Sequence, residues 1–109
     1  MIYTYNKLTR DKVVGIIENL GKKTTFEILD DVRYGQELDK KLVEEVNEYL
    51  ADHSIEEMAD VMEVIMAILN FRGISFEQVQ KVMEDKRNKR GAFENKIFLK
   101  QVEKDNYNG

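Results

Sequence analysis

Apolar residues recur at helical spacing in four segments of the chain, which predicts four helices. The first helix is expected to run from an N-cap at Thr9 to about Leu20, because Gly21 follows as a C-terminal stop. The second is expected over about Val32–Ala51, where the apolar stripe consists of Leu38, Leu42, Val46, Tyr49 and Leu50. The polar residues 52–54 separate this helix from the third segment.

Capping patterns and glycines define the third and fourth helices. The capping-box pattern, a Ser three positions before Glu or Gln, occurs as Ser54 with Glu57 and as Ser75 with Gln78. Each of these helices is expected to end at the next glycine, Gly73 or Gly91. Short links favour antiparallel neighbours, so the predicted fold class is all-α, an antiparallel helical bundle of four main helices that forms one domain over residues 1–109.

Three short segments are expected to be extended rather than helical. Residues 2–5 precede the first helix, residues 24–29 alternate weakly and are β-prone, and residues 96–102 form an apolar-rich tail. The tail is expected to form a strand that pairs with the segment near Phe26. The predicted β structure is therefore confined to short pieces outside the helices.

Composition and charge exclude several classes of function. The 109 residues suffice for one domain, and the 42% apolar share is ordinary for a globular protein. There is no cysteine and hence no thiolate metal site, and the formal net charge of -4 argues against a nucleic-acid partner. The first residues do not resemble a signal peptide, and no apolar run approaches the ~20 residues of a membrane span. We therefore expect a cytoplasmic protein with no nucleic-acid and no membrane partner.

The charged residues are unevenly distributed along the chain. No Lys or Arg occurs from Leu42 to Phe71. The same window contains the acidic residues Glu44, Glu45, Glu48, Asp52, Glu56, Glu57, Asp60 and Glu63. A solvated helix face usually mixes acids with bases. Solvent, distant basic segments or a bound cation must therefore offset the repulsion among these acids.

Two of the acids lie on the apolar side of the third helix. Glu57 and Asp60 share a stripe with Val64, Ala67 and Phe71, and this helix is apolar nearly all round. Buried carboxylates that lie close together must be protonated, paired with a base or bound to a metal ion. Oxygen ligands without His or Cys suit Mg²⁺, with Mn²⁺ as the second choice.

The second helix supplies a matching pair of acids. Glu45 and Glu48 are three residues apart and project to one side of the helix. Across a tight hairpin both pairs would lie near the turn, and the predicted metal ligands are therefore Glu45, Glu48, Glu57 and Asp60. Two simpler interpretations stay open: Glu57 completes a capping box, and the acids of the second helix form a solvated face.

Three blocks of the sequence resemble one known superfamily. Residues 44–48 (EEVNE) and 57–60 (EMAD) resemble the E-x-x-E … E-x-x-D signature of the MazG-like all-α NTP pyrophosphohydrolases, which include dimeric dUTPases and phosphoribosyl-ATP pyrophosphohydrolases. Residues 5–12 (YNKLTRDK) and 90–93 (RGAF) are similar to the opening and close of a small single-domain branch. The eight residues between the two halves of the signature form a shorter gap than many members have, which indicates a tight hairpin.

The resemblance implies an enzyme that cleaves a nucleoside triphosphate between its α- and β-phosphates. The products would be a nucleoside monophosphate and pyrophosphate, the cofactor Mg²⁺ or Mn²⁺, and one such role is nucleotide-pool cleansing. Glu45 is the expected general base, although nothing in the sequence separates it from Glu44 or Glu48. Arg and Lys complement phosphate oxygens, and the expected substrate-binding residues are Lys7, Arg10, Lys86 and Arg90.

The apolar third helix and the resemblance together predict a homodimer or a dimer of dimers, with the site near the subunit interface. Two other functions stay open. One is a non-catalytic helical module that binds a nucleotide or a partner protein and keeps the acidic site for stability. The other is a plain helical dimerisation domain whose acids are solvated.

Overall fold

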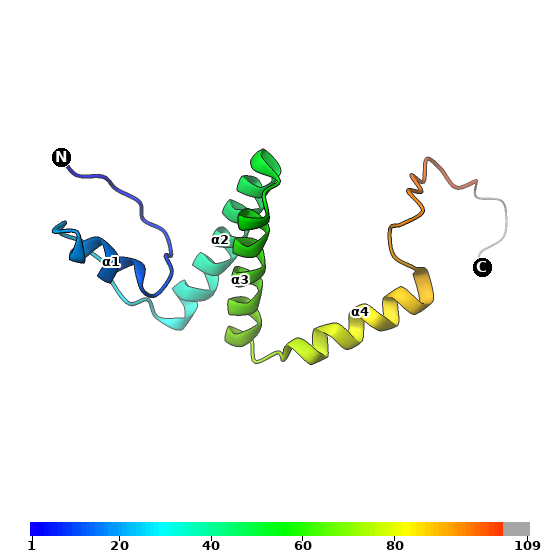
Figure 1. Ribbon diagram of the computed structural model, residues 1–109. Coiled ribbons are helices and arrows are strands. Elements are labelled where there is room, and N and C mark those ends of the chain that lie inside the picture. The colour runs from blue at the N-terminus through cyan, green and yellow to red at the C-terminus, as the bar shows by residue number, and fades with distance from the viewer. Residues whose placement is uncertain (104–109) are drawn as a thin grey trace. The chain divides into compact units, whose positions relative to one another are not determined.

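The computed structural model describes residues 1–103, and all of their regular secondary structure is helical (Figure 1). The helices are α1 (Val13–Asn19), α2 (Asp31–Asp52), α3 (Ile55–Phe71) and α4 (Phe76–Arg90). The predicted all-α class and its four helices are confirmed, whereas the packing of all four into one bundle stays a prediction. Within residues 1–103, no helix combines the length and apolarity that crossing a membrane requires.

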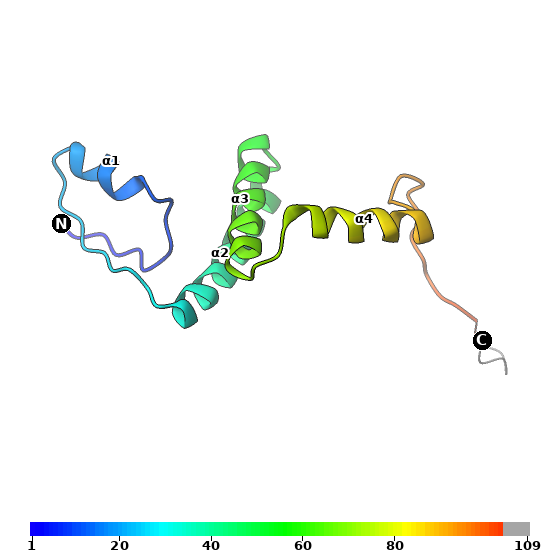
Figure 2. The same ribbon diagram turned by 90° about the horizontal axis from the view of Figure 1, so that it is seen from below.

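Helices α2 and α3 pack against each other as a hairpin (Figures 1 and 2). At the C-terminal end of α2, His53 takes a left-handed conformation with φ of 56°, and the His53 N–H donates to the carbonyl of Tyr49. Ser54 then caps α3, because its hydroxyl accepts a hydrogen bond from the Glu57 N–H at 3.2 Å, as the capping pattern predicts. The chain thus reverses within two residues, and the end of α2 lies beside the start of α3.

The hairpin contains a small apolar core. Among the described residues, Leu38 of α2 and Val64 of α3 are the only buried apolar side chains. Near the open end, the Phe71 ring meets the Tyr34 ring edge-on, with the centroids 5.2 Å apart. Gly35 lets this ring approach α2, because a Cβ at that position would lie 2.9 Å from Phe71 Cε2. Apolar packing therefore joins the two helices at the end away from the turn.

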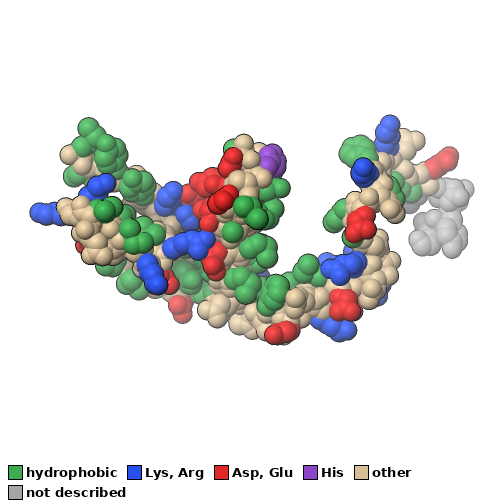
Figure 3. Space-filling model, in the orientation of Figure 1, with side chains coloured by type: hydrophobic (Ala, Val, Ile, Leu, Met, Phe, Trp, Pro, Cys, Tyr) green, Lys and Arg blue, Asp and Glu red, His purple; other side chains and the backbone are tan. Residues whose placement is uncertain are grey.

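One face of the hairpin leaves apolar side chains exposed. Stripes at helical spacing run along both helices and are between 37% and 60% exposed at Val43, Val46, Leu50, Met58, Met62 and Met66. Figure 3 shows apolar side chains gathered on one side of the hairpin and acidic ones on another. Two buried apolar residues are few for a stable hairpin, so this face is a surface at which further burial would add stability.

The start of the first helix differs from the expectation. Thr9 is not its N-cap: α1 begins at Val13, and Lys12 occupies the N-cap position without a side-chain cap. The basic segment before α1 instead reaches toward the hairpin, as described below. Glycines end the later helices as expected, since Gly73 follows α3 with φ of 69° and Gly91 follows α4 with φ of 82°.

The predicted strands are wrong. Residues 1–103 contain no strand, so residues 24–29 and the tail 96–102 are irregular segments and not a β pair. The side chains of these segments gain little burial, with Phe26 60% and Phe98 84% exposed. A β-prone stretch forms a strand only where a neighbour satisfies its backbone and covers one face. Local propensity therefore misled the prediction in both segments.

The chain divides into two compact units, Met1–Phe76 and a second one that starts at Glu77. The first contains α1 and the hairpin. The second contains α4, except for its first residue, and the segment that follows it. Along α4 the apolar side chains of Val82 and Met83 are more than half exposed.

Candidate metal centre

Both predicted acidic pairs lie at the turn end of the hairpin. One carboxylate oxygen from each of Glu45, Glu57 and Asp60 lies within 4.8 Å of the other two. A second group with the same spacing joins Glu45 to Glu44 and Glu48 on α2. Glu45 belongs to both groups, so the fold gathers the four predicted ligands around this one side chain.

Glu45 is buried at the centre of these groups. It is 7% exposed, and no other charged side chain of the described residues is buried. Its Oε1 lies 3.4 Å from Lys41 Nζ, whereas its Oε2 has no hydrogen-bond partner. Glu57 Oε2 is likewise buried and without a partner. A buried carboxylate oxygen that has lost its hydration is unfavourable unless a donor or a cation replaces the water.

The electrostatics of the cluster oppose full ionisation. Burial raises the pKa of Glu45, and the charge of Glu48 raises it further. Burial also raises the pKa of Glu57, and the charge of Glu48 raises it further. Both shifts have the direction expected for carboxylates crowded together in a site of low polarity. A divalent cation would reverse this effect, because it favours the ionised form of each group.

Two residues of the N-terminal segment pair with the acids. Lys7 Nζ donates to Glu44 Oε1 at 2.7 Å, and Arg10 Nη2 donates to Asp60 Oδ1 at 2.7 Å. Arg10 also lies 3.5 Å from Glu63. The hydrogen bond from Lys7 lowers the pKa of Glu44. Distant bases thus offset part of the acidic window. Of the predicted substrate-binding residues, Arg10 pairs with the predicted ligand Asp60, and Lys7 pairs with Glu44, the neighbour of Glu45.

The third base of this cluster, Lys41, was not predicted from the sequence. Its Nζ lies 3.4 Å from Glu44 Oε2 and 3.4 Å from Glu45 Oε1. The residue directly precedes the window that is free of Lys and Arg, and it is therefore easily overlooked. The available signal was its spacing of four residues from Glu45, which places both side chains on one helix face.

The other two predicted substrate-binding residues lie on α4. Lys86 and Arg90 belong to the second unit, and their role at the site stays a prediction. Arg90 borders a cavity of about 380 Å³ that residues 90–97 line, and this segment includes the RGAF block.

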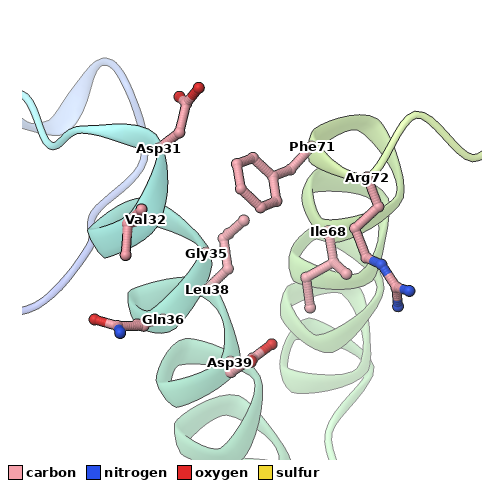
Figure 4. A pocket seen from close by; sticks show the side chains of 9 residues that line it. All are labelled: Asp31, Val32, Gly35, Gln36, Leu38, Asp39, Ile68, Phe71 and Arg72. Atoms are coloured by element: carbon pink, nitrogen blue, oxygen red, sulfur yellow. The ribbon is translucent and has the colours of Figure 1, made fainter.

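A larger cavity lies at the opposite end of the hairpin and contains none of the predicted site residues. It has a volume of about 450 Å³ between the first turns of α2 and the last turn of α3 (Figure 4). Apolar groups from both helices meet there, with the Phe71 ring directed toward α2 near Gly35. The clustered carboxylates at the turn end and this cavity are thus separate features.

The side chains present fit a hard divalent cation. All four predicted ligands are carboxylates, and two buried oxygens among them lack a partner. Comparisons of the chain with family models, with curated proteins and with solved structures found no match.

Proposed function

We propose that the protein is a Mg²⁺-dependent nucleoside-triphosphate pyrophosphohydrolase of the MazG-like type. It would cleave a nucleotide between the α- and β-phosphates to give a nucleoside monophosphate and pyrophosphate, and nucleotide-pool cleansing is one role that this reaction serves. The observation that carries the proposal is the buried Glu45, whose Oε2 lacks a partner within a group of carboxylates from both helices. The ordered resemblance of the three sequence blocks supports the same reaction.

The proposed ligands are Glu45, Glu48, Glu57 and Asp60, and Mn²⁺ can substitute for Mg²⁺. When held by these residues, Mg²⁺ would neutralise charge on the phosphates and would lower the pKa of a coordinated water. Glu45 is the proposed general base, because a carboxylate beside the metal can accept a proton from a coordinated water. The hairpin holds these groups in place from two packed helices, which limits their motion during the reaction.

The basic residues of the N-terminal segment are proposed to hold the distal phosphates. The Lys7–Glu44 and Arg10–Asp60 pairs are partly exposed, with the two bases 45% and 57% exposed. Ion pairs that solvent reaches contribute little to stability, so both bases can exchange a carboxylate for a phosphate oxygen. Lys86 and Arg90 are proposed as further phosphate ligands on the sequence resemblance alone.

A homodimer or a dimer of dimers is the proposed assembly. The exposed valine, leucine and methionine stripes of α2 and α3 support it, because a second hairpin would bury them and complete a four-helix bundle. Replacing Met62, at the middle of its stripe, with Lys should therefore reduce the mass measured by light scattering to that of a monomer. An unchanged mass would exclude this face as the interface.

The function is tested by incubating the purified chain with a panel of canonical and modified nucleoside triphosphates. Pyrophosphate release is measured with Mg²⁺, without it and after addition of EDTA. We expect turnover of at least one nucleotide with Mg²⁺ and none with EDTA. The absence of metal-dependent turnover across the panel would contradict the proposal.

A matched pair of variants identifies the part played by the carboxylates. Asp60→Asn and Glu63→Gln each remove an acid that pairs with Arg10. Only Asp60 belongs to one of the two clusters of carboxylates that could hold a metal ion. We expect Asp60→Asn to lower turnover on the order of a hundredfold or more, and Glu63→Gln to change it little. Equal losses in the two variants would indicate that the pairing with Arg10 matters rather than the carboxylate group.

One observation favours a second candidate, a non-catalytic module that binds a nucleotide or a partner protein. Lys7, Arg10 and Lys41 already neutralise part of the cluster, and such pairing also suits an acidic site kept for stability. This module would bind Mg²⁺ or Mn²⁺, as judged by an increase in melting temperature, without releasing pyrophosphate from any nucleotide.

A further inference from the structure

We propose that Lys41 is a positioning residue of the metal centre, which holds one carboxylate oxygen of Glu45 and leaves the other as the single oxygen that Glu45 offers to a cation. The inference rests on the metal site proposed above and concerns a residue outside the acidic signature. Its basis is the difference in surroundings between the two carboxylate oxygens of the buried Glu45. Oε1 has Lys41 as its neighbour at 3.4 Å, and Oε2 has no partner.

The surroundings of Lys41 differ from those of an ordinary surface lysine. Its side chain is 18% exposed, whereas that of the adjacent Lys40 is 74% exposed and pairs with Glu37. Lysine is rarely enclosed unless its charge is paired. Lys41 meets this condition through Glu44 and Glu45, at 3.4 Å in each case. The enclosure thus fixes the ammonium group beside the most buried carboxylate of the site.

Two opposite effects on a bound cation follow from this position. The positive charge repels the cation and weakens its binding. The same charge keeps Oε1 occupied, so that Glu45 binds through one oxygen and the cation retains open positions for water and phosphate. Loss of Lys41 should therefore strengthen cation binding and lower turnover. Loss of a residue that only stabilised the fold would weaken both.

The test compares Lys41→Met, Lys41→Arg and the control Lys40→Met with the natural chain. Mn²⁺ is the probe, its affinity is measured by titration followed by electron paramagnetic resonance, and pyrophosphate release gives turnover. For Lys41→Met we expect Mn²⁺ to bind on the order of tenfold more tightly and to show an altered spectrum of the bound ion. Turnover of Lys41→Met should fall by a similar factor. Lys41→Arg and Lys40→Met should both keep the Mn²⁺ affinity and the turnover of the natural chain.

The outcomes distinguish a failure of this inference from a failure of the proposed metal site. If the natural chain binds no Mn²⁺, the metal site and the role of Lys41 both fail. If the natural chain binds Mn²⁺ and Lys41→Met has the same affinity as Lys40→Met, only the positioning role fails. Weaker binding in Lys41→Met together with a lower melting temperature would also overturn it, because that pattern marks a structural residue.

Discussion

The two ends of the α2–α3 hairpin use the same pair of helices for different purposes. At the open end, Leu38, Phe71 and the small Gly35 make a close apolar contact. At the turn end, Glu45 meets the acids of α3, and burial raises its pKa. The open end therefore stabilises the hairpin, and the crowded acids at the turn end destabilise it.

This difference indicates how the acids are kept together. Carboxylates that repel one another would separate if the helices were free to do so. The short turn at His53 and Ser54 and the apolar contact at the far end hold the two helices side by side, so the acids remain close. Packing at the open end of the hairpin therefore offsets the repulsion among the acids at the turn end.

The largest expected effect comes from Glu45→Gln. This change removes the buried charge, so turnover should fall on the order of a hundredfold or more, and the Mg²⁺-induced rise in melting temperature should disappear. Without metal the variant should be more stable than the natural chain, by on the order of 1 kcal/mol, because a neutral amide costs less to bury. Calorimetry with and without Mg²⁺ measures both effects.

The control for that change is Glu56→Gln. Glu56 is exposed on α3 and belongs to neither carboxylate group. It should keep both turnover and the response to Mg²⁺. A lower stability of Glu45→Gln without metal would show that the acidic end also contributes to folding, and the contrast between the two ends would be lost.

The next largest effect is expected at the open end. Leu38→Ala removes the most buried apolar side chain and should lower the free energy of unfolding by about 2–5 kcal/mol, as measured by urea titration. Leu38 lies two turns before Glu45, about 10 Å along the helix, so the increase in stability on adding Mg²⁺ should be kept. Leu38→Met is the milder control. Loss of the Mg²⁺ response in Leu38→Ala would mean that the two ends are coupled.

A smaller effect is expected for Gly35→Ala. The new methyl group would press on the Phe71 ring at 2.9 Å, and overpacking costs about 1–3 kcal/mol, which exceeds the gain in helix propensity of about 1 kcal/mol. Gly15→Ala is the matched control, because a Cβ at Gly15 has nothing within 4 Å and should stabilise α1 slightly. Thermal unfolding of both variants checks the prediction, and equal shifts would indicate that the ring moves aside at no cost.

The smallest expected effect is a dependence on pH. Since the pKa values of Glu45 and Glu57 are raised above 4.5, the folded chain binds more protons than the unfolded chain just above that pH. Without metal, the stability that these two groups contribute should fall as pH rises through this window. Mg²⁺ binds the ionised groups, so its effect on the melting temperature should be larger at about pH 7.5 than at about pH 5.

Glu44 has the opposite sign, because its pKa is lowered by Lys7. The stability from that pair is present above the ordinary pKa of Glu and is lost as pH falls below it. Lys7→Met should therefore weaken this acidic branch of the profile, of which Lys41 keeps a part, and leave the branch above 4.5 in place. If Mg²⁺ raises the melting temperature equally at about pH 7.5 and at about pH 5, this result would argue against cation binding by Glu45 and Glu57.

The sequence by itself determined the helices and indicated which acids the hairpin brings together. Periodicity and the Ser54 cap placed α2 and α3 to within a residue or two, since these signals act between residues that are near in sequence. The spacing of Glu45 and Glu48 likewise fixed which acids share a helix side. The pairing of Lys41 with Glu45 was available from the same local rule but was missed.

Only the tertiary structure decided which acid is buried, which bases meet the cluster and which β-prone segments remain irregular. Glu44 and Glu45 are equivalent in the sequence, yet Glu45 alone is buried against α3. Lys7 and Arg10 reach acids that lie 37 and 50 residues away, and no local pattern encodes such a pairing. Burial and ion pairing depend on what the rest of the chain places nearby, whereas a helix depends mainly on its own neighbours.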